Sequence, residues 1–306
     1  MKDAWPVARR VSQTPAWLGE GARWDASRDE LLWVDILGHQ VRRSAVDATS
    51  GLLLDVATYD IGMVVGAAAP VARGGGWVLA AGQGIAHLAE DGAVSVLAEC
   101  EPLSARTRMN DAACDPAGRF VAGSMATDGS RQAGSLYSID LDGALSVLRR
   151  QVTSSNGLGW APGGHTLYYV DSGRRMLEAI SYDPASGTLG ESVAIVRFDD
   201  EDGIPDGLVV DEEGAVWIAM WGAGEVRRYH GSGRLMSRVI VPVRRPSSVC
   251  IGGVTGRTLF ITSAAGDGPG EAEVEPDAGH VFAVELDVGG PPVRAYGGPV
   301  EVARPR

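Results

Sequence analysis

Four side chains with oxygen donors lie in polar, glycine-rich phrases of the sequence: Glu20 in LGEGARW, Asn110 in RMNDAA, Asn156 in SSNGLGW and Asp206 in IPDGLVV. Each one alone would be an ordinary turn residue, because Asn-Gly and Asp-Gly are strong turn dipeptides. Carboxylate and amide oxygens are also the ligands that Ca²⁺, Mg²⁺ and Mn²⁺ prefer, whereas a tetrahedral zinc site is rich in His or Cys. The four residues therefore indicate a cation site, provided that the fold brings them together.

A hydrophobic strand pattern recurs six times along the chain and supplies such a fold. Its central residues are spaced by 45, 42, 48, 49 and 43 residues, and they are Trp33, Val78, Phe120, Tyr168, Trp217 and Phe260. Each is followed by a second strand and a turn with Asp-Gly, Ser-Gly or Gly-Gly, which suits β-hairpins. Six units of about 45 residues predict an all-β, six-bladed β-propeller, with one four-stranded blade per unit around a central channel. Five or seven blades are the alternatives to this count.

The four oxygen-donor residues share one phase within this repeat. They precede the central residue of their unit by 13, 10, 12 and 11 positions, respectively. The first strand of each propeller blade lines the channel, so residues at the start of those strands converge on one mouth. Converging donors would repel or stay unsatisfied unless a cation or water lies between them. We also expect residues 1–306 to form one domain, and the segment Val7–Val11 to pair with the last blade and close the ring.

Five phrases, in this order between about residues 16 and 296, resemble the SMP-30/gluconolactonase/regucalcin family of six-bladed propellers: LGEGARWD, RTRMNDAACDPAGRFVAGSM, SSNGLGWAP, IPDGLVVDEEGAVWIAMWGAGEVRRY and TLFITSA. The resemblance implies a lactonase that depends on one divalent metal ion, which could be Ca²⁺, Zn²⁺, Mn²⁺, Mg²⁺ or Fe²⁺. It implies that the metal ligands are Glu20, Asn156 and Asp206.

The same resemblance implies the residues that contact the substrate. Asn110 would contact substrate or a water on the metal, and Arg108 would contact substrate. Asp128 follows the GSM phrase, where some members have Glu, and its side chain is one methylene shorter, so we expect it on the sugar-binding side. The expected reaction is hydrolysis of an aldono-1,4- or 1,5-lactone, such as gluconolactone, in carbohydrate catabolism. The metal would polarise the carbonyl and activate water, with Asp206 as general base.

Two other functions are open at this point. One is a related propeller hydrolase of phosphoesters or other esters, which tends to carry a catalytic histidine facing the channel. None of the five histidines falls at the start of an inner strand: His39, His87, His165, His230 and His280. The other is a non-enzymatic calcium-binding or scaffold propeller, which would not need Glu20, Asn156 and Asp206 in one phase.

Composition and charge exclude several further classes. The 306 residues carry 39 acidic and 27 basic side chains, a net charge of −12, which argues against a nucleic-acid partner. The sequence contains no run of about 18 apolar residues, so it predicts no membrane-spanning helix. The start, MKDAWPVARR, shows no secretory pattern, and three scattered cysteines suit a reducing compartment, so we expect a cytoplasmic protein. Residues 99–108 are the one stretch expected to carry a helical turn.

Overall fold

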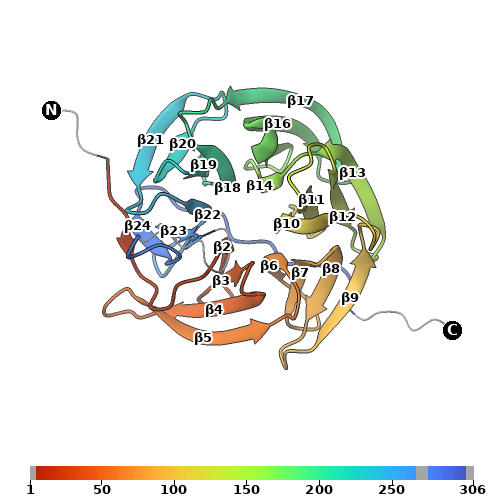
Figure 1. Cartoon of the computed structure of the whole chain (residues 1–306), viewed down its shortest axis with the longest axis horizontal. Helices are drawn as coiled ribbons and strands as arrows, with labels where there is room; N and C mark the ends of the chain where they lie inside the picture. The colour runs from red at the N-terminus through yellow and green to blue at the C-terminus, as the bar shows by residue number, and fades with distance from the viewer. Residues whose placement is uncertain (1–4, 267–274, 301–306) are drawn as a thin grey trace.

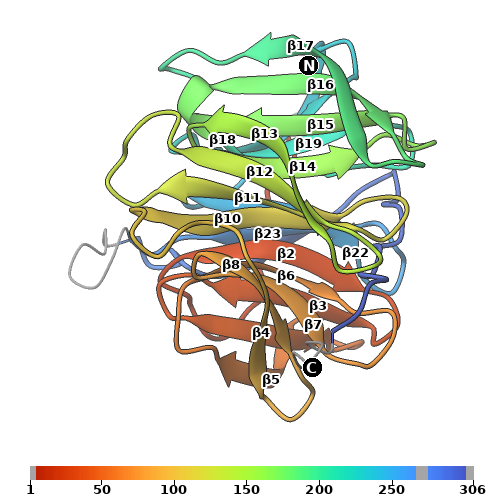
Figure 2. The same ribbon diagram turned by 90° about the vertical axis from the view of Figure 1, so that its right-hand side faces the viewer.

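The computed structural model describes residues 5–266 and 275–300, and its strands form a ring of six four-stranded antiparallel sheets. Figure 1 shows the six blades around a centre that is surrounded by β2, β6, β10, β14, β18 and β22. Figure 2, turned by 90°, shows the strands running across the ring from one face to the other. The all-β, six-bladed β-propeller is therefore confirmed.

Each blade follows the chain from its inner to its outer strand. The first two blades consist of β2 (Gly19–Asp25), β3 (Glu30–Asp35), β4 (Gln40–Val46), β5 (Leu53–Asp60), β6 (Val65–Pro70), β7 (Trp77–Ala81), β8 (Gly84–Leu88) and β9 (Val94–Glu99). The third and fourth consist of β10 (Thr107–Cys114), β11 (Phe120–Ala126), β12 (Gly134–Ile139), β13 (Leu145–Val152), β14 (Ser155–Trp160), β15 (Thr166–Asp171), β16 (Met176–Asp183) and β17 (Thr188–Arg197). The last two consist of β18 (Ile204–Val210), β19 (Val216–Trp221), β20 (Glu225–Tyr229), β21 (Leu235–Ile240), β22 (Pro246–Gly252), β23 (Thr258–Ser263), β24 (Phe282–Glu285) and β1 (Arg9–Arg10).

The six central residues of the repeat lie in the second strands of six successive blades. These strands are β3, β7, β11, β15, β19 and β23. All six residues of β3 are buried, because both faces of an inner-half strand pack against a neighbouring blade. Val34 of β3, for example, shares an apolar cluster with Val65 and Leu79 of the next blade. Packing between blades therefore fixes where each inner strand lies.

The N-terminal segment closes the ring as expected. Arg9 and Arg10 in β1 pair antiparallel with Ala283 and Phe282 in β24, and Val7 bridges to the fifth blade. This pairing covers the edge of the last blade, which would otherwise be open to pairing with another chain.

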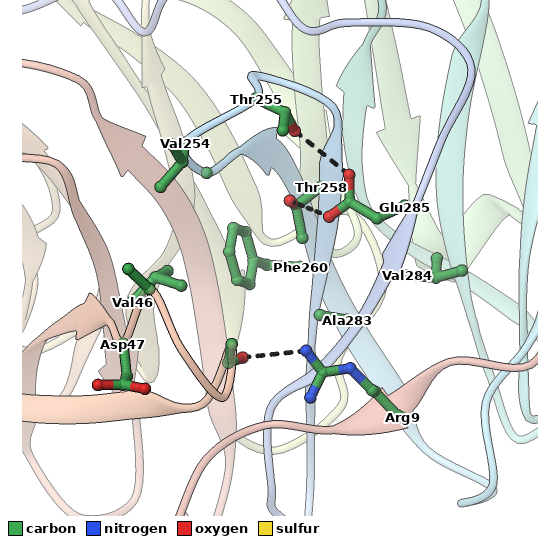
Figure 3. A pocket seen from close by; sticks show the side chains of 13 residues that line it. Arg9, Val46, Asp47, Val254, Thr255, Thr258, Phe260, Ala283, Val284 and Glu285 are labelled. Atoms are coloured by element: carbon green, nitrogen blue, oxygen red, sulfur yellow. Dashed lines mark hydrogen bonds between the residues drawn. The ribbon is translucent and has the colours of Figure 1, made fainter.

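A hollow of about 250 Å³ lies where the last blade meets the first. Figure 3 shows Arg9 pointing across it to the backbone carbonyl of Gly51, and Thr255 and Thr258 both turned toward Glu285. These contacts pair the polar groups on its wall with one another, and no candidate site residue lies in it.

The expected helical turn at residues 99–108 is wrong. Pro102 and Ala105 form a hydrogen-bonded turn, and the side chain of Gln83 donates to both of their carbonyl oxygens, so the segment is held as a tight loop before β10. The helical turn of the described residues is instead the 3₁₀ segment η1 (Ser172–Arg174). In the part of the chain that the structure describes, no helix is long and apolar enough to cross a bilayer.

Candidate metal centre at one mouth of the channel

Every inner strand of the propeller has a β-bulge at the same place. The register shifts fall between Glu20 and Arg23, Val65 and Ala67, Met109 and Ala112, Ser155 and Leu158, Pro205 and Leu208, and Pro246 and Val249. A bulge bends the strand and re-aims a side chain. Five strands have one residue directly after the last paired position before the shift, and in β2 the last paired residue itself, Glu20, takes this place. We call these six residues the axial ring: Glu20, Gly66, Asn110, Asn156, Asp206 and Ser247.

The two asparagines of the axial ring belong to one hydrogen-bonded chain. Arg108 Nη1 donates to Asn110 Oδ1 at 2.5 Å, and Asn110 Nδ2 donates to Asn156 Oδ1 at 3.2 Å and to the Ser155 carbonyl oxygen at 2.7 Å. Asn156 Nδ2 in turn donates to Ser172 Oγ at 2.9 Å. Each amide side chain is therefore held by hydrogen bonds to a neighbouring blade or to η1.

The two carboxylates of the axial ring are almost fully buried, and Glu20 and Asp206 are each 7% exposed. Burial, and after it the charge of Asp111, raise the pKa of Glu20 to about 8, although the Gly21 N–H and the charges of Arg108 and Arg23 act in the opposite direction. Burial, then Glu20 and Asp111, raise the pKa of Asp206 well above its usual range. The arrangement thus concentrates negative charge in a place that water barely reaches.

Asp206 Oδ1 is buried and has no hydrogen-bond partner among the described residues, and the same is true of Asp111 Oδ2. An unpaired buried carboxylate oxygen is costly unless a cation or another donor satisfies it. The donors around it are carboxylate and amide oxygens, which fit a hard divalent cation. Across residues 5–266 and 275–300, no group of three His, Cys, Asp or Glu side chains is arranged to hold a metal ion. A cation here would therefore rely on the amide of Asn156 beside the two carboxylates.

Arg108 is a cationic side chain whose charge acts on both of these carboxylates. Burial lowers the pKa of Arg108, whereas Glu20 and Asp206 raise it through their charges. The guanidinium is thus placed beside the same groups that would hold a cation, where it can meet an oxygen of a bound molecule.

Asp128 lies apart from this cluster. It is exposed, in the loop after β11, and it accepts a hydrogen bond from the Ser130 backbone N–H at 3.0 Å. Hydrogen bonds from Ser130 and the charge of Arg106 hold its pKa below the usual range. The end of β11 pairs with the start of β10, so Asp128 lies at the same mouth as the axial ring but on its rim. Its role in substrate binding stays a prediction.

The structure adds residues that the sequence argument did not select. Ser247 completes the axial ring, and its position 13 residues before Phe260 has the phase of the other four, so the same spacing rule could have found it. Asp111 directly follows Asn110 and is 3% exposed, with an ion pair to Arg23 at 3.2 Å. The spacing of the repeat does not single out Arg23, because its contact with Asp111 joins two different blades.

Glycine at the second blade's position in the axial ring lets two inner strands approach closely. A Cβ on Gly66 would lie 2.2 Å from the Asn110 carbonyl oxygen, and one on Gly157 would lie 2.5 Å from the Leu208 nitrogen. Four side-chain donors can converge because these neighbouring positions carry no side chain.

Gly66→Ala should therefore displace Asn110 and destabilise the protein by roughly 1–3 kcal/mol, the usual cost of overpacking. Thermal unfolding would measure the loss. Gly256→Ala is the comparison, because nothing lies within 4 Å of its added methyl group, and only its positive φ opposes the change. Equal stability of Gly66→Ala and the parent protein would contradict the close approach.

The fold and the site together define a class: a six-bladed propeller with an oxygen-donor centre at one mouth of its channel. Residues 18–265 match the family model described as "SMP-30/Gluconolactonase/LRE-like region", and the chain belongs to this family. It is therefore a lactonase-like propeller, as the sequence phrases indicate.

Two relatives and one solved structure illustrate the likeness. The chain is 30% identical over 281 residues to the Bacillus subtilis (strain 168) protein named "Putative sugar lactone lactonase YvrE", covering 91% of this chain and 94% of that one. It is 34% identical over 291 residues to regucalcin of Gallus gallus, covering 92% and 95%. The solved structure of a calcium-binding protein, regucalcin, from Agrobacterium tumefaciens strain C58 superposes with a TM-score of 0.86 at 26% identity, covering 95% and 98%.

Proposed function

We propose that this chain is a divalent-metal-dependent lactonase that hydrolyses a sugar lactone to its open aldonic acid. The substrate would be an aldono-1,4- or 1,5-lactone such as gluconolactone, used in carbohydrate catabolism. The observation that carries the proposal is the axial ring, in which Glu20, Asn110, Asn156 and Asp206 converge and Asp206 Oδ1 has no hydrogen-bond partner among the described residues. The name of the Bacillus subtilis relative, a sugar lactone lactonase, supports the reaction class.

Three residues of the ring would hold the cation: Glu20, Asn156 and Asp206. A bound divalent cation would supply Lewis-acid polarisation of the lactone carbonyl and a more acidic water. The all-oxygen donor set favours Ca²⁺, Mg²⁺ or Mn²⁺ over Zn²⁺. Zn²⁺ and Fe²⁺ are the other two ions to be tested.

Asp206 would act as the general base in the same site. It takes a proton from the attacking water, whose oxygen bonds to the lactone carbonyl carbon, and the ring C–O bond then breaks. The leaving ring oxygen ends as a hydroxyl group with that proton. The second proton of the water is released from the new carboxyl group to solvent, so the acid leaves as the carboxylate. Burial raises the pKa of Asp206, which makes the free carboxylate a better proton acceptor than an exposed one, whereas a bound cation would lower that pKa.

Arg108 and Asn110 would orient the substrate, with Arg108 donating to a lactone or hydroxyl oxygen. Arg108→Gln should lower kcat/KM about 10- to 100-fold, the loss expected for one hydrogen bond from a charged donor. Steady-state kinetics on the preferred lactone would measure it. Arg106→Gln is the matched control, because Arg106 is exposed two residues away. Equal kinetics of Arg108→Gln and Arg106→Gln would remove Arg108 from the substrate site.

One experiment separates this proposal from its alternatives. The metal-loaded protein is assayed on a panel of sugar lactones, other esters and phosphoesters, with calcium binding measured alongside. Turnover of a sugar lactone above the other classes supports the proposal. Preference for a phosphoester, or tight calcium binding without any turnover, would support a rival class instead.

A further inference from the structure

A second cavity, of about 500 Å³, lies in the half of the channel away from the axial ring. Its wall is formed by the later residues of the inner strands and is largely apolar, with Cys114, Leu158, Leu208, Val249 and Ile251 among its lining residues. None of Glu20, Arg108, Asn110, Asn156 or Asp206 lines it. Its size is within the range of pockets that hold small organic molecules.

The segment 289–297, which we call the strap, crosses the mouth of this cavity. At one end, the Gly289 carbonyl oxygen and the Gly290 N–H bond to the fifth and sixth blades; at the other, the Tyr296 N–H donates to the Pro70 carbonyl oxygen. Figure 1 shows this blue segment passing behind the centre of the ring toward the β6–β9 blade. Pro291 and Pro292 lie between the two attachments and line the cavity, so the strap stays extended over it.

Arg23 is the charged group in the deep wall of this cavity, and it is 7% exposed. Its guanidinium donates to the Ala22 and Ala112 carbonyl oxygens and to Asp111 Oδ1. These bonds take three of its five N–H groups, and within the described residues the remaining two, including Nε–H, make no hydrogen bond. Asp111, the ion-pair partner, is not part of the cavity wall.

The charge of the lining is opposite to that of the whole molecule. Arg23 and Arg294 line the cavity against one carboxylate, Glu212, whose Oε1 already accepts the Gly289 N–H. The protein as a whole carries a net charge of −12. An apolar wall with a buried arginine at its end suits a molecule with an apolar body and one anionic head. It does not suit a sugar, because hydroxyl groups buried against Leu158 and Leu208 would lose their hydrogen bonds.

We propose that this cavity is a second ligand site, which binds an apolar organic anion, with its head on Arg23 and its tail along the apolar wall beneath the strap. The class is a medium-length aliphatic or an aromatic carboxylate. None of the axial-ring residues lines this cavity, so binding of the anion does not require a cation or a lactone at the other mouth.

Calorimetric titration with decanoate tests this site in the full-length protein. We expect one decanoate per chain, and an affinity about 10- to 100-fold lower in Arg23→Met, the loss expected for a hydrogen bond to a charged group. Val293→Glu places a negative charge on the strap and should weaken decanoate at least tenfold. Its matched control is Val96→Glu, at an exposed position on β9 outside the cavity, which should bind as the parent does.

Neutral and cationic probes identify what Arg23 recognises. Decan-1-ol should bind Arg23→Met as well as the parent, and decylammonium should bind the parent more weakly than decanoate. Absence of decanoate binding, equal affinity for decanoate and decylammonium, or unchanged affinity in Val293→Glu would each overturn the proposal. So would decanoate binding that disappears in Asp206→Asn, because it would place the anion at the axial ring. Should Arg23→Met not fold, Val293→Glu and the probe comparison still decide.

Discussion

Asp206→Asn should leave the propeller folded and lower lactone turnover at least ~10²-fold, the lower range for loss of a general base. The amide keeps the shape of the carboxyl group but removes its negative charge and its ability to take a proton. Because Asp206 is buried beside Glu20 and Asp111, neutralising it also relieves repulsion, so the unfolding temperature of the cation-free protein should not fall. Measurements of kcat, bound metal and thermal unfolding on one preparation check the three expectations.

A buried aspartate at the other end of an inner strand provides the matched control. Asp25 ends β2 and accepts hydrogen bonds from Ser27 through Oδ1, which an asparagine can also accept. Asp25→Asn should therefore keep nearly full activity. Near-normal turnover of Asp206→Asn with metal bound would assign the base to another group.

Cation affinity should rise with pH up to about 8. Without a cation, burial and Asp111 raise the pKa of Glu20 to about 8, so below that pH the side chain is largely protonated. A metal ligand must be deprotonated, so binding at neutral pH releases a proton. The apparent affinity should then fall about tenfold for each pH unit below 8, until other groups titrate. Calorimetry in buffers of different ionisation enthalpy would measure both the affinity and the released proton.

The raised pKa of Glu20 also makes the stability of the cation-free protein depend on pH. A carboxyl group whose folded-state pKa lies above its unfolded value holds its proton more tightly when folded, so the cation-free protein is favoured at low pH. It should lose stability as pH rises from about 4.5 to about 8. Added cation should restore stability, with the largest gain near pH 8. Glu20→Gln should remove both effects. A cation affinity that stays flat between pH 6 and 8 would contradict the prediction.

The blade repeat could be predicted because its cause is local. A strand buried on both faces needs apolar residues in succession, and a hairpin needs a turn dipeptide. The sequence around Trp33, Phe120 and Trp217 has both, so it predicts the blades. The position of Glu20, Asn156 and Asp206 also follows from it, since residues in one phase of a propeller must lie at one mouth.

The remaining parts of the site depend on contacts between blades. The six bulges orient the side chains of the axial ring. No residue type predicts a bulge, because a register shift is a property of two paired strands. Gly66 is ordinary in sequence, and only the closeness of Asn110 in the third blade explains it. Asp128 lies in the loop after β11, whose shape depends on contacts that the phrase around it does not specify, and its role in substrate binding stays a prediction.

The central claim is that a divalent cation held by Glu20, Asn156 and Asp206 is needed for lactone hydrolysis. The most direct measurement is turnover of a sugar-lactone panel by exhaustively chelated protein, before and after addition of Ca²⁺, Mg²⁺, Mn²⁺, Zn²⁺ or Fe²⁺, with circular dichroism on the same samples. We predict that chelation abolishes activity but leaves the strand signal, because the blades bury their own cores, and that one added ion restores turnover. Full lactonase activity in the chelated protein would contradict the account and leave the axial ring as a set of strand residues at β-bulges with no catalytic cation.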